Sequence, residues 1–187
     1  MTVAPLRRRG RATRALALVG IVGLPATAPA NDRHVVAASL QDDACGENVL
    51  LEKVVALVNE ERARKDAERV KKGLSRLPRL RIDRALMRAA AGHNDLMIEK
   101  DELTHQVRGE RTLGERIRAS GYEWSAVAEN VAAGQRTPAE VVTAWMRSER
   151  HRDNILSAEY ADVGVAHGMT GGGEHYWTMV FAARLRS

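Results

Sequence analysis

Apolar residues recur at helical spacing in the first half of the chain and form continuous or alternating runs near its end. Between Leu50 and Val58 they follow a three- and four-residue spacing, with charged residues on the other face, which predicts an amphipathic helix. The charged stretch that follows extends this helix as far as Gly73, because glycine favours helix ends. Residues 31–47 show no such period, which indicates a linker or N-terminal arm.

Two shorter helices are predicted next. Residues 74–82 are expected to form a loop, since Pro78 cannot occupy a helix interior. Asp83 is then a suitable N-cap for a helix over residues 84–100. A third helix over residues 113–121 ends in a glycine.

A fourth helix has the strongest start signal in the chain. Residues 122–136 before it lack a clear period and are predicted to be irregular or partly extended. Thr137 can then cap a helix, Pro138 suits its first position, and Glu140 completes a capping box. These signals predict a helix over residues 137–148.

The C-terminal part carries strand patterns instead. Residues 161–168 and 176–185 are apolar runs joined by the glycine-rich segment 171–175, which predicts a terminal β-hairpin. Helices followed by a hairpin, without an alternation of strands and helices, indicate an α+β fold rather than a doubly wound α/β fold.

The first thirty residues predict an export signal. Five arginines precede a short apolar run over residues 15–24, and small residues in Ala-x-Ala spacing follow, so cleavage is expected after Ala30 or Ala28. That run is about half the roughly 20 residues that span a bilayer, which argues against a transmembrane segment. The chain is therefore predicted to be secreted or to act in the cell envelope, with residues 48–187 as its folded domain.

Removing this signal changes the charge of the protein. The whole chain has 29 basic and 24 acidic residues, and loss of the five arginines leaves 24 of each. A net charge of zero supports no nucleic-acid partner and no attraction to anionic lipid. Cys45 is the single cysteine, so an internal disulfide is excluded.

Three polar residues are candidates for a shared site. His105 follows a predicted helix in a loop, Glu129 lies in a segment predicted to be irregular, and His151 lies at a predicted helix end. Two imidazoles and a carboxylate suit a divalent metal with an open position, and they equally suit a buried hydrogen-bond network. His93 falls on the apolar side of its helix, which favours a packed structural histidine.

Five segments of the chain together resemble the CAP superfamily, which holds the cysteine-rich secretory proteins, venom antigen 5 and plant pathogenesis-related proteins. The exported bacterial branch is the most similar. The segments are "VNEERA" (58–63), "AAGHNDLM" with "LTH" (90–97, 103–105), "AENVAAG" (128–134), "VVTAWMRSERHRDNIL" (141–156) and "DVGVAHG…YWTMVF" (162–168, 176–181). This resemblance implies a three-layer α–β–α sandwich with a central antiparallel sheet.

The resemblance also implies a cleft lined by two histidines and two acids, which hold a divalent metal in some members. His105 and Glu129 match the first histidine and the first acid. The other two positions fall on Tyr176 and Ser148, so two expected ligands are substituted. His151 matches a histidine that the bacterial branch carries after its tryptophan, and we expect it to enter the cleft.

The main functional hypothesis is a secreted binding or interaction module whose cleft could hold a divalent cation such as zinc, or a hydrophobic ligand. Its partner would be an extracytoplasmic lipid, cell-envelope component or protein. The alternative is a metal-assisted hydrolase in which His105, Glu129 and His151 hold the cation. A weaker hypothesis uses Ser148 or Ser157 as a nucleophile beside His151, although no orienting group or oxyanion hole is evident.

Four further residues have structural interpretations. Asn130 and Asn154 are expected to tie down turns, and Trp145 and Trp177 are expected to lie in the core because their spacing matches that of its apolar residues.

Overall fold

The computed structural model describes the backbone of residues 32–186 and the side chains of residues 48–186. The predicted signal peptide, residues 1–30, lies outside this range. Contacts divide the chain into residues 1–38 and residues 39–187, and the description below concerns the second unit. No helix within the described range is long and apolar enough to cross a membrane.

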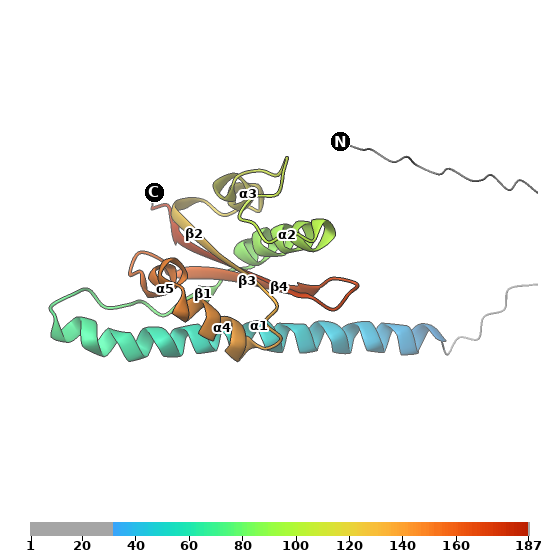
Figure 1. The fold of residues 1–187 in the computed structure, drawn as a ribbon, viewed down its shortest axis with the longest axis horizontal. Helices are drawn as coiled ribbons and strands as arrows, with labels where there is room; N and C mark the ends of the chain where they lie inside the picture. The colour runs from blue at the N-terminus through green and yellow to red at the C-terminus, as the bar shows by residue number, and fades with distance from the viewer. Residues whose placement is uncertain (1–31, 187) are drawn as a thin grey trace, which may run out of the picture. The chain divides into compact units, whose positions relative to one another are not determined.

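A four-stranded sheet forms the centre of the fold, in the order β1-β3-β4-β2 (Figure 1). The predicted hairpin is confirmed as β3, Asp162–Met169, and β4, His175–Arg184. The outer strand β2, Trp124–Ala133, pairs antiparallel with β4 along its length. The two-residue strand β1, Arg81–Ile82, pairs in parallel with β3, so the sheet is mixed, with three antiparallel strands.

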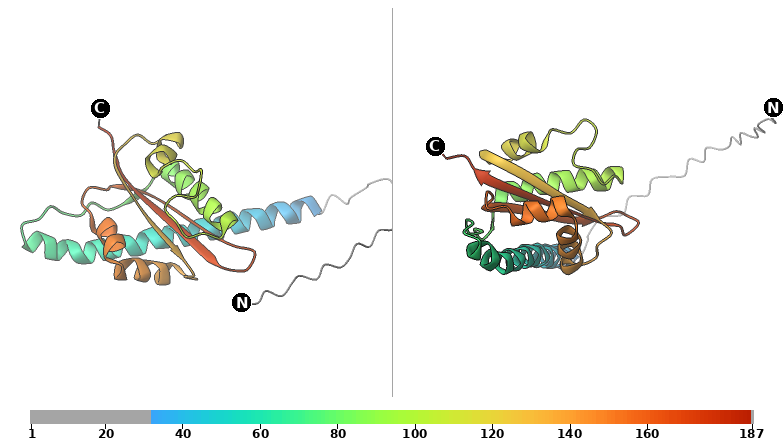
Figure 2. Two further views of the ribbon diagram at one scale, coloured as in Figure 1. Left: turned by 45° about the horizontal axis from the view of Figure 1, so that its top comes forward. Right: turned by 60° about the vertical axis from the view of Figure 1, so that its left-hand side comes forward.

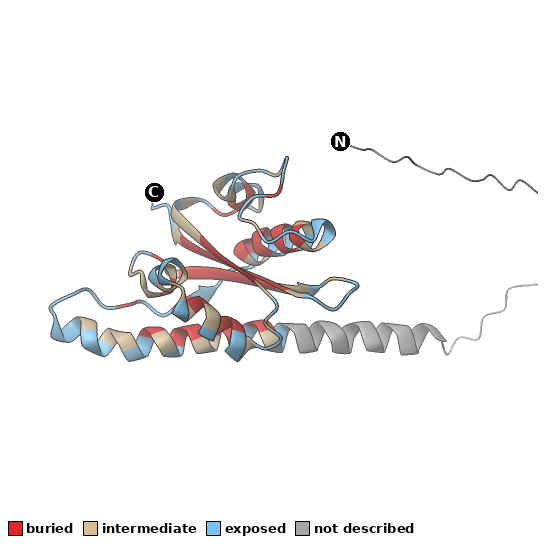
Figure 3. Cartoon of the chain, in the orientation of Figure 1, coloured by how far each residue is buried: buried red, intermediate tan, exposed pale blue. Residues whose placement is uncertain are grey.

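Helices cover both faces of this sheet (Figure 2). On one face, the second half of α1, Asp32–Lys71, packs with α4, Pro138–Arg147, and α5, Glu149–Leu156. The other face is covered by α2, Arg84–Lys100, and α3, Leu113–Ala119. The α+β sandwich is thus confirmed, and residues coloured as buried run along the strands of the sheet and along parts of α1 and α2 (Figure 3).

Alternate residues of the central strands pack into the hydrophobic cores on the two faces of the sheet. On β4, Trp177 and Met179 contact the layer of α1 and α4, while Tyr176 and Val180 contact the layer of α2 and α3. This division follows from the two-residue period of a strand. Trp145 and Trp177 are 1% and 0% exposed, which confirms their predicted place in the core.

The structure differs from the local predictions in three places. Residues 122–136, predicted to be irregular or partly extended, contain the ten-residue strand β2, because their backbone groups pair with β4, a contact that these residues cannot reveal by themselves. Likewise the loop over residues 74–82 ends in β1, which forms only by pairing with β3. Helix α1 begins at Asp32 rather than near Val49, so the backbone of the predicted arm is helical from Asp32 onward.

The predicted N-caps at Asp83 and Thr137 are confirmed, whereas the predicted capping box at Glu140 is wrong. Asp83 caps α2 by accepting hydrogen bonds from the backbone N–H groups of Ala85 and Leu86. Thr137 caps α4 by accepting one from Glu140. The carboxylate of Glu140 accepts from the N–H of Arg136, one residue before the position that a capping box requires.

Candidate functional site

Glu129 is the buried acid of the candidate site. It lies on β2 opposite Val180, and its side chain is only 2% exposed on the face that α2 and α3 cover. One carboxylate oxygen, Oε2, accepts a hydrogen bond from Nη2 of Arg116 at 3.0 Å. The other, Oε1, is 3.1 Å from Nδ1 of His105. Both oxygens of Glu129 therefore already have partners.

A second carboxylate continues this network. Nδ1 of His93 lies 2.9 Å from Glu110, and Nε2 of the same ring lies 2.9 Å from the carbonyl oxygen of Thr104. Glu110 also lies 3.3 Å from Nε of Arg116. His93 is fully buried, so the prediction of a packed histidine with its hydrogen bonds satisfied is confirmed.

Arg116 and Glu110 were missed by the sequence analysis. Arg116 lies on α3, where Ile117 and the partly buried Leu113 contact the core. It follows Leu113 by three residues, so it falls on the same helix face. A charged residue at such a core-facing position is a usable signal, because buried arginines are rare unless they are paired.

His151 approaches the site from the opposite layer. It lies in the first turn of α5, and its carbonyl oxygen accepts a hydrogen bond from Asn130 on β2 at 3.0 Å. Asn154 donates in turn to Oδ1 of Asn130 at 2.9 Å. As predicted, these two asparagines fix local backbone, here by joining α5 to β2.

The predicted helix end at His151 was wrong. Helix α4 ends at Arg147, and Ser148 separates it from a new helix, α5. Glu149 and Arg150 form the start of this second helix. His151 is therefore near the start of a helix rather than at the end of one.

The free edge of the sheet allows the two histidines to lie within electrostatic range of each other. Strand β2 is the last strand, so the loop that carries His105 on one face and α5 on the other can approach around its free edge. The two imidazoles interact, since the charge of His105 contributes to lowering the pKa of His151.

The pKa values of the two imidazoles are shifted in opposite directions. The hydrogen bond from His105 to Glu129 raises the pKa of His105 above its ordinary value. Burial lowers the pKa of His151, and repulsion by His105 lowers it further. The site therefore pairs one imidazole whose pKa is raised with another whose pKa is lowered.

Tyr176 and Ser148 form no hydrogen bond with Glu129, His105 or His151 among the described residues. Tyr176 is 4% exposed on β4, opposite Ala133, and its hydroxyl donates to Oδ1 of Asp101 at 2.9 Å. It therefore ties β4 to the C-terminal cap of α2. Ser148 is half-buried between α4 and α5, and the described residues give its hydroxyl no hydrogen bond to His151.

A divalent metal does not fit this arrangement well. Within residues 48–186, no group of three or more His, Cys, Asp or Glu side chains is placed to hold a metal ion. Both oxygens of Glu129 are engaged, and one of them contacts the guanidinium of Arg116. A cation at Glu129 would have to displace His105 and would face the positive charge of Arg116.

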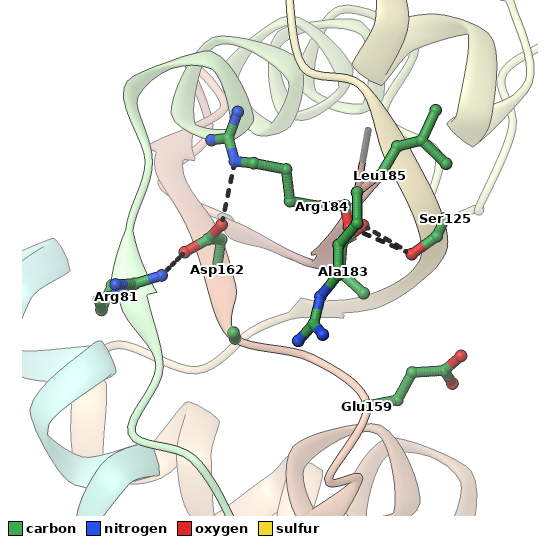
Figure 4. A pocket seen from close by; sticks show the side chains of 9 residues that line it. Arg81, Ser125, Glu159, Asp162, Ala183, Arg184 and Leu185 are labelled. Carbon is green, nitrogen blue, oxygen red and sulfur yellow. Dashed lines mark hydrogen bonds and ion pairs between the residues drawn. The ribbon is translucent and has the colours of Figure 1, made fainter.

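A further cavity lies elsewhere on the sheet. It has a volume of about 910 Å³ and is lined by residues that include Arg81, Asp162 and Arg184 (Figure 4). Asp162 is buried and accepts from the hydroxyl of Tyr122 at 2.8 Å, with Arg81 at 3.3 Å. None of the predicted site residues lines this cavity.

Comparison with known proteins identifies the family. Residues 55–181 match the family model of the cysteine-rich secretory protein family, CAP. The chain belongs to the CAP family. It is 36% identical over 132 residues to YkwD of Bacillus subtilis, a match that covers 71% of this chain and 46% of YkwD. The membrane protein YlbC of the same organism is 28% identical, over 62% of this chain and 31% of its own length. The CAP chain thus spans less than half of either relative.

Solved structures agree with this assignment. An extracellular protein of Bacillus anthracis that contains an SCP domain is 25% identical, with a TM-score of 0.62 over 74% of this chain and 41% of its own. An outer surface protein of Borrelia burgdorferi, 22% identical, has a TM-score of 0.54 over 66% of this chain and 90% of its own, which shows a shared fold.

Proposed function

We propose that this CAP-domain protein is an exported binding module, and that His105 and His151 form the polar part of its ligand site. The observation that supports this proposal best is the state of Glu129. Its carboxylate accepts from both Arg116 and His105, so it orients His105 and raises the pKa of that imidazole instead of serving as a free base or metal ligand. Export rests on the N-terminal sequence pattern, in keeping with the extracellular or surface origin of two structural neighbours.

The chemistry of the site favours recognition of an anionic or hydrogen-bond-accepting group. The side chain of His105 is 60% exposed, and its hydrogen bond to Glu129 raises its pKa, which favours the cationic imidazolium as a donor to a ligand in solvent. His151 has a lowered pKa and offers a neutral imidazole next to it. A lipid headgroup, a cell-envelope polymer or a protein surface could supply the acceptor.

Co-sedimentation tests this binding proposal. The chain from residue 31 onward is mixed with purified bacterial cell wall, or with vesicles that contain anionic phospholipid, and the bound fraction is measured. The His105→Ala, His151→Ala double variant should lose at least about tenfold in affinity, as expected for losing a charge-assisted contact. Arg150→Ala, an exposed neighbour of His151, is the control and should bind as the wild type does.

Calorimetry with zinc and calcium tests the metal-assisted alternative. We expect no micromolar binding of either ion to the wild-type chain, because Arg116 and His105 occupy Glu129. Micromolar zinc binding that the double variant loses would refute this interpretation and would favour the hydrolase. Equal sedimentation of the wild-type chain and the double variant would refute the role of the histidine pair in binding.

A further inference from the structure

Two half-buried histidines meet next to the turn of the terminal hairpin (Figure 1). Nε2 of His167 on β3 lies 2.9 Å from Nδ1 of His175 on β4. His167 lies opposite Trp177, and His175 lies two residues before it, so all three side chains share one face of the sheet. This is the face that α1 and α4 cover, whereas Glu129 lies on the other face. The hairpin pair, His167 and His175, is therefore separate from the site at His105 and Glu129.

Packing and backbone pairing hold both members of the hairpin pair in place. The ring of His167 lies against the indole of the fully buried Trp177, with the ring centroids 4.1 Å apart. The carbonyl oxygen of His175 accepts a hydrogen bond from the N–H of Gly134 at 2.9 Å, which joins the start of β4 to the residue that follows β2. Side chains that are placed in advance in this way lose less entropy when a ligand binds.

The contact between the two rings leaves a nitrogen lone pair available. At a separation of 2.9 Å one nitrogen donates and the other accepts, so at least one of the two is unprotonated. Burial, and to a smaller extent repulsion by His175, lowers the pKa of His167 to about 4, so protons compete little for this ring at neutral pH. The neutral imidazole is the form that binds metal ions.

The separation of the two nitrogens suits neighbouring ligands of one metal ion. Metal–imidazole bonds are about 2.0 Å long, so two donors at a right angle lie about 2.8 Å apart. The observed separation is 2.9 Å. Right angles between neighbouring ligands are the geometry of Cu(II), whereas a tetrahedral zinc ion needs its donors about 3.3 Å apart and two further ligands. The hairpin pair therefore fits copper better than zinc.

Met169 supplies a third donor of suitable chemistry. It lies opposite His175 in the strand register, so both side chains lie on the same face of the hairpin. Its side chain is exposed, which leaves the thioether sulfur open to an ion from solvent. A thioether is a soft ligand that selects Cu(I), and it serves as a weak axial ligand of Cu(II).

We propose that His167, His175 and Met169 form a copper-binding site on the terminal hairpin. Nε2 of His167 and Nδ1 of His175 bind the ion at neighbouring positions, and Sδ of Met169 allows the site to hold Cu(I) as well as Cu(II). The proton between the rings moves to the other nitrogen of its own imidazole, so the bound rings stay neutral. A small rotation of the half-buried His175 directs both lone pairs at the metal.

Calorimetry with Cu(II), in the presence of glycine as a competing ligand, tests this proposal on the chain from residue 31 onward. We expect one equivalent to bind with micromolar affinity or better and to give the EPR spectrum of a tetragonal ion with nitrogen ligands. Zinc should bind at least about tenfold more weakly, since Cu(II) exceeds zinc in affinity for nitrogen ligands. Equal affinity for the two ions would overturn the assignment to copper, and absence of saturable Cu(II) binding would overturn the site.

Two variants test the individual ligands. His175→Gln removes one imidazole at the first residue of β4 and should weaken Cu(II) binding by at least about tenfold. Met169→Leu keeps an apolar side chain at an exposed position and should weaken Cu(I) binding about tenfold, measured by competition with a chromophoric chelator, while Cu(II) binding changes little. Unfolding in urea checks that both variants fold. Wild-type Cu(II) affinity in His175→Gln would refute the site, and wild-type Cu(I) affinity in Met169→Leu would refute the role of the thioether.

Two control variants distinguish the hairpin from the other histidines of the chain. His34→Ala removes a histidine near the start of the tested chain, and the His105→Ala, His151→Ala variant removes the imidazoles of the candidate site. Both should bind copper as the wild type does. Loss of copper binding in either control would place the ion at those histidines and refute the hairpin site. The proposed binding function is tested separately with cell wall and vesicles, so the two proposals can fail independently.

Discussion

Gly164 of β3 lies directly against the backbone of α2, and its replacement tests how tightly the helix packs on the sheet. A Cβ at this position would lie 2.1 Å from the carbonyl carbon of Leu86, 2.3 Å from its oxygen and 2.4 Å from the nitrogen of Met87. These are backbone atoms of α2, so no rotation of a side chain relieves the contact. Ordinary van der Waals separation begins at 3.4 Å, so α2 would have to move by more than 1 Å.

We therefore expect Gly164→Ala to lower the free energy of unfolding by about 3 kcal/mol, the upper end of the usual range for overpacking. With an m-value of roughly 2 kcal/mol/M, the urea midpoint should fall by about 1.5 M. Because α2 carries His93, its displacement should also disturb the contact with Glu110. Shifted NMR resonances at both residues would report this change.

Gly92→Ala is the matched control, since it makes the same substitution within α2. A Cβ there meets nothing within 4 Å, and replacing a helical glycine by alanine stabilises by about 0.5–1 kcal/mol. The two variants should therefore shift the urea midpoint in opposite directions. A loss below about 0.5 kcal/mol for Gly164→Ala would refute the argument from close packing.

Three further predictions concern buried polar contacts. Arg62→Met should cost about 3 kcal/mol in urea unfolding, because the arginine donates to backbone carbonyls of three segments that would lose their donor. Glu129→Gln should lower the pKa of His105, measured by NMR titration, and an unchanged pKa would contradict the assigned contact. Because the folded-state pKa of His105 is raised, the stability that this contact gives the wild type is present at acid pH and is lost as pH rises through that pKa. Tyr176→Phe should cost about 1 kcal/mol through loss of the hydrogen bond to Asp101, whereas an unchanged urea midpoint would show that this bond contributes nothing.

Sequence patterns predicted α2, α3, α4 and the final hairpin because their signals are local. The cap at Asp83, the Thr137–Pro138 start and the glycine after α3 each act on backbone groups only a few residues away. The alternation of β4 likewise depends on its own residues. These caps and strands could therefore be predicted from the sequence without knowledge of the tertiary fold.

Strand β2 could not be predicted from local sequence patterns alone. Its residues "WSAVAENVAA" include small and polar types that do not mark a strand, and the segment becomes extended because β4 supplies its hydrogen-bond partners. The same holds for β1 and its pairing with β3. Non-local pairing therefore decided which of the apparently irregular segments became strands.

The candidate site divides in the same way. The sequence by itself determined the residue types, including His105, Glu129 and His151, and the family motifs that contain them. Only the tertiary structure placed Arg116 against Glu129, because these residues lie on α3 and β2 and meet through packing of the helix on the sheet. Local sequence specifies side-chain chemistry and backbone preference. Which charges share a buried environment, and so which pKa values shift, depends on contacts between segments that are distant in the chain.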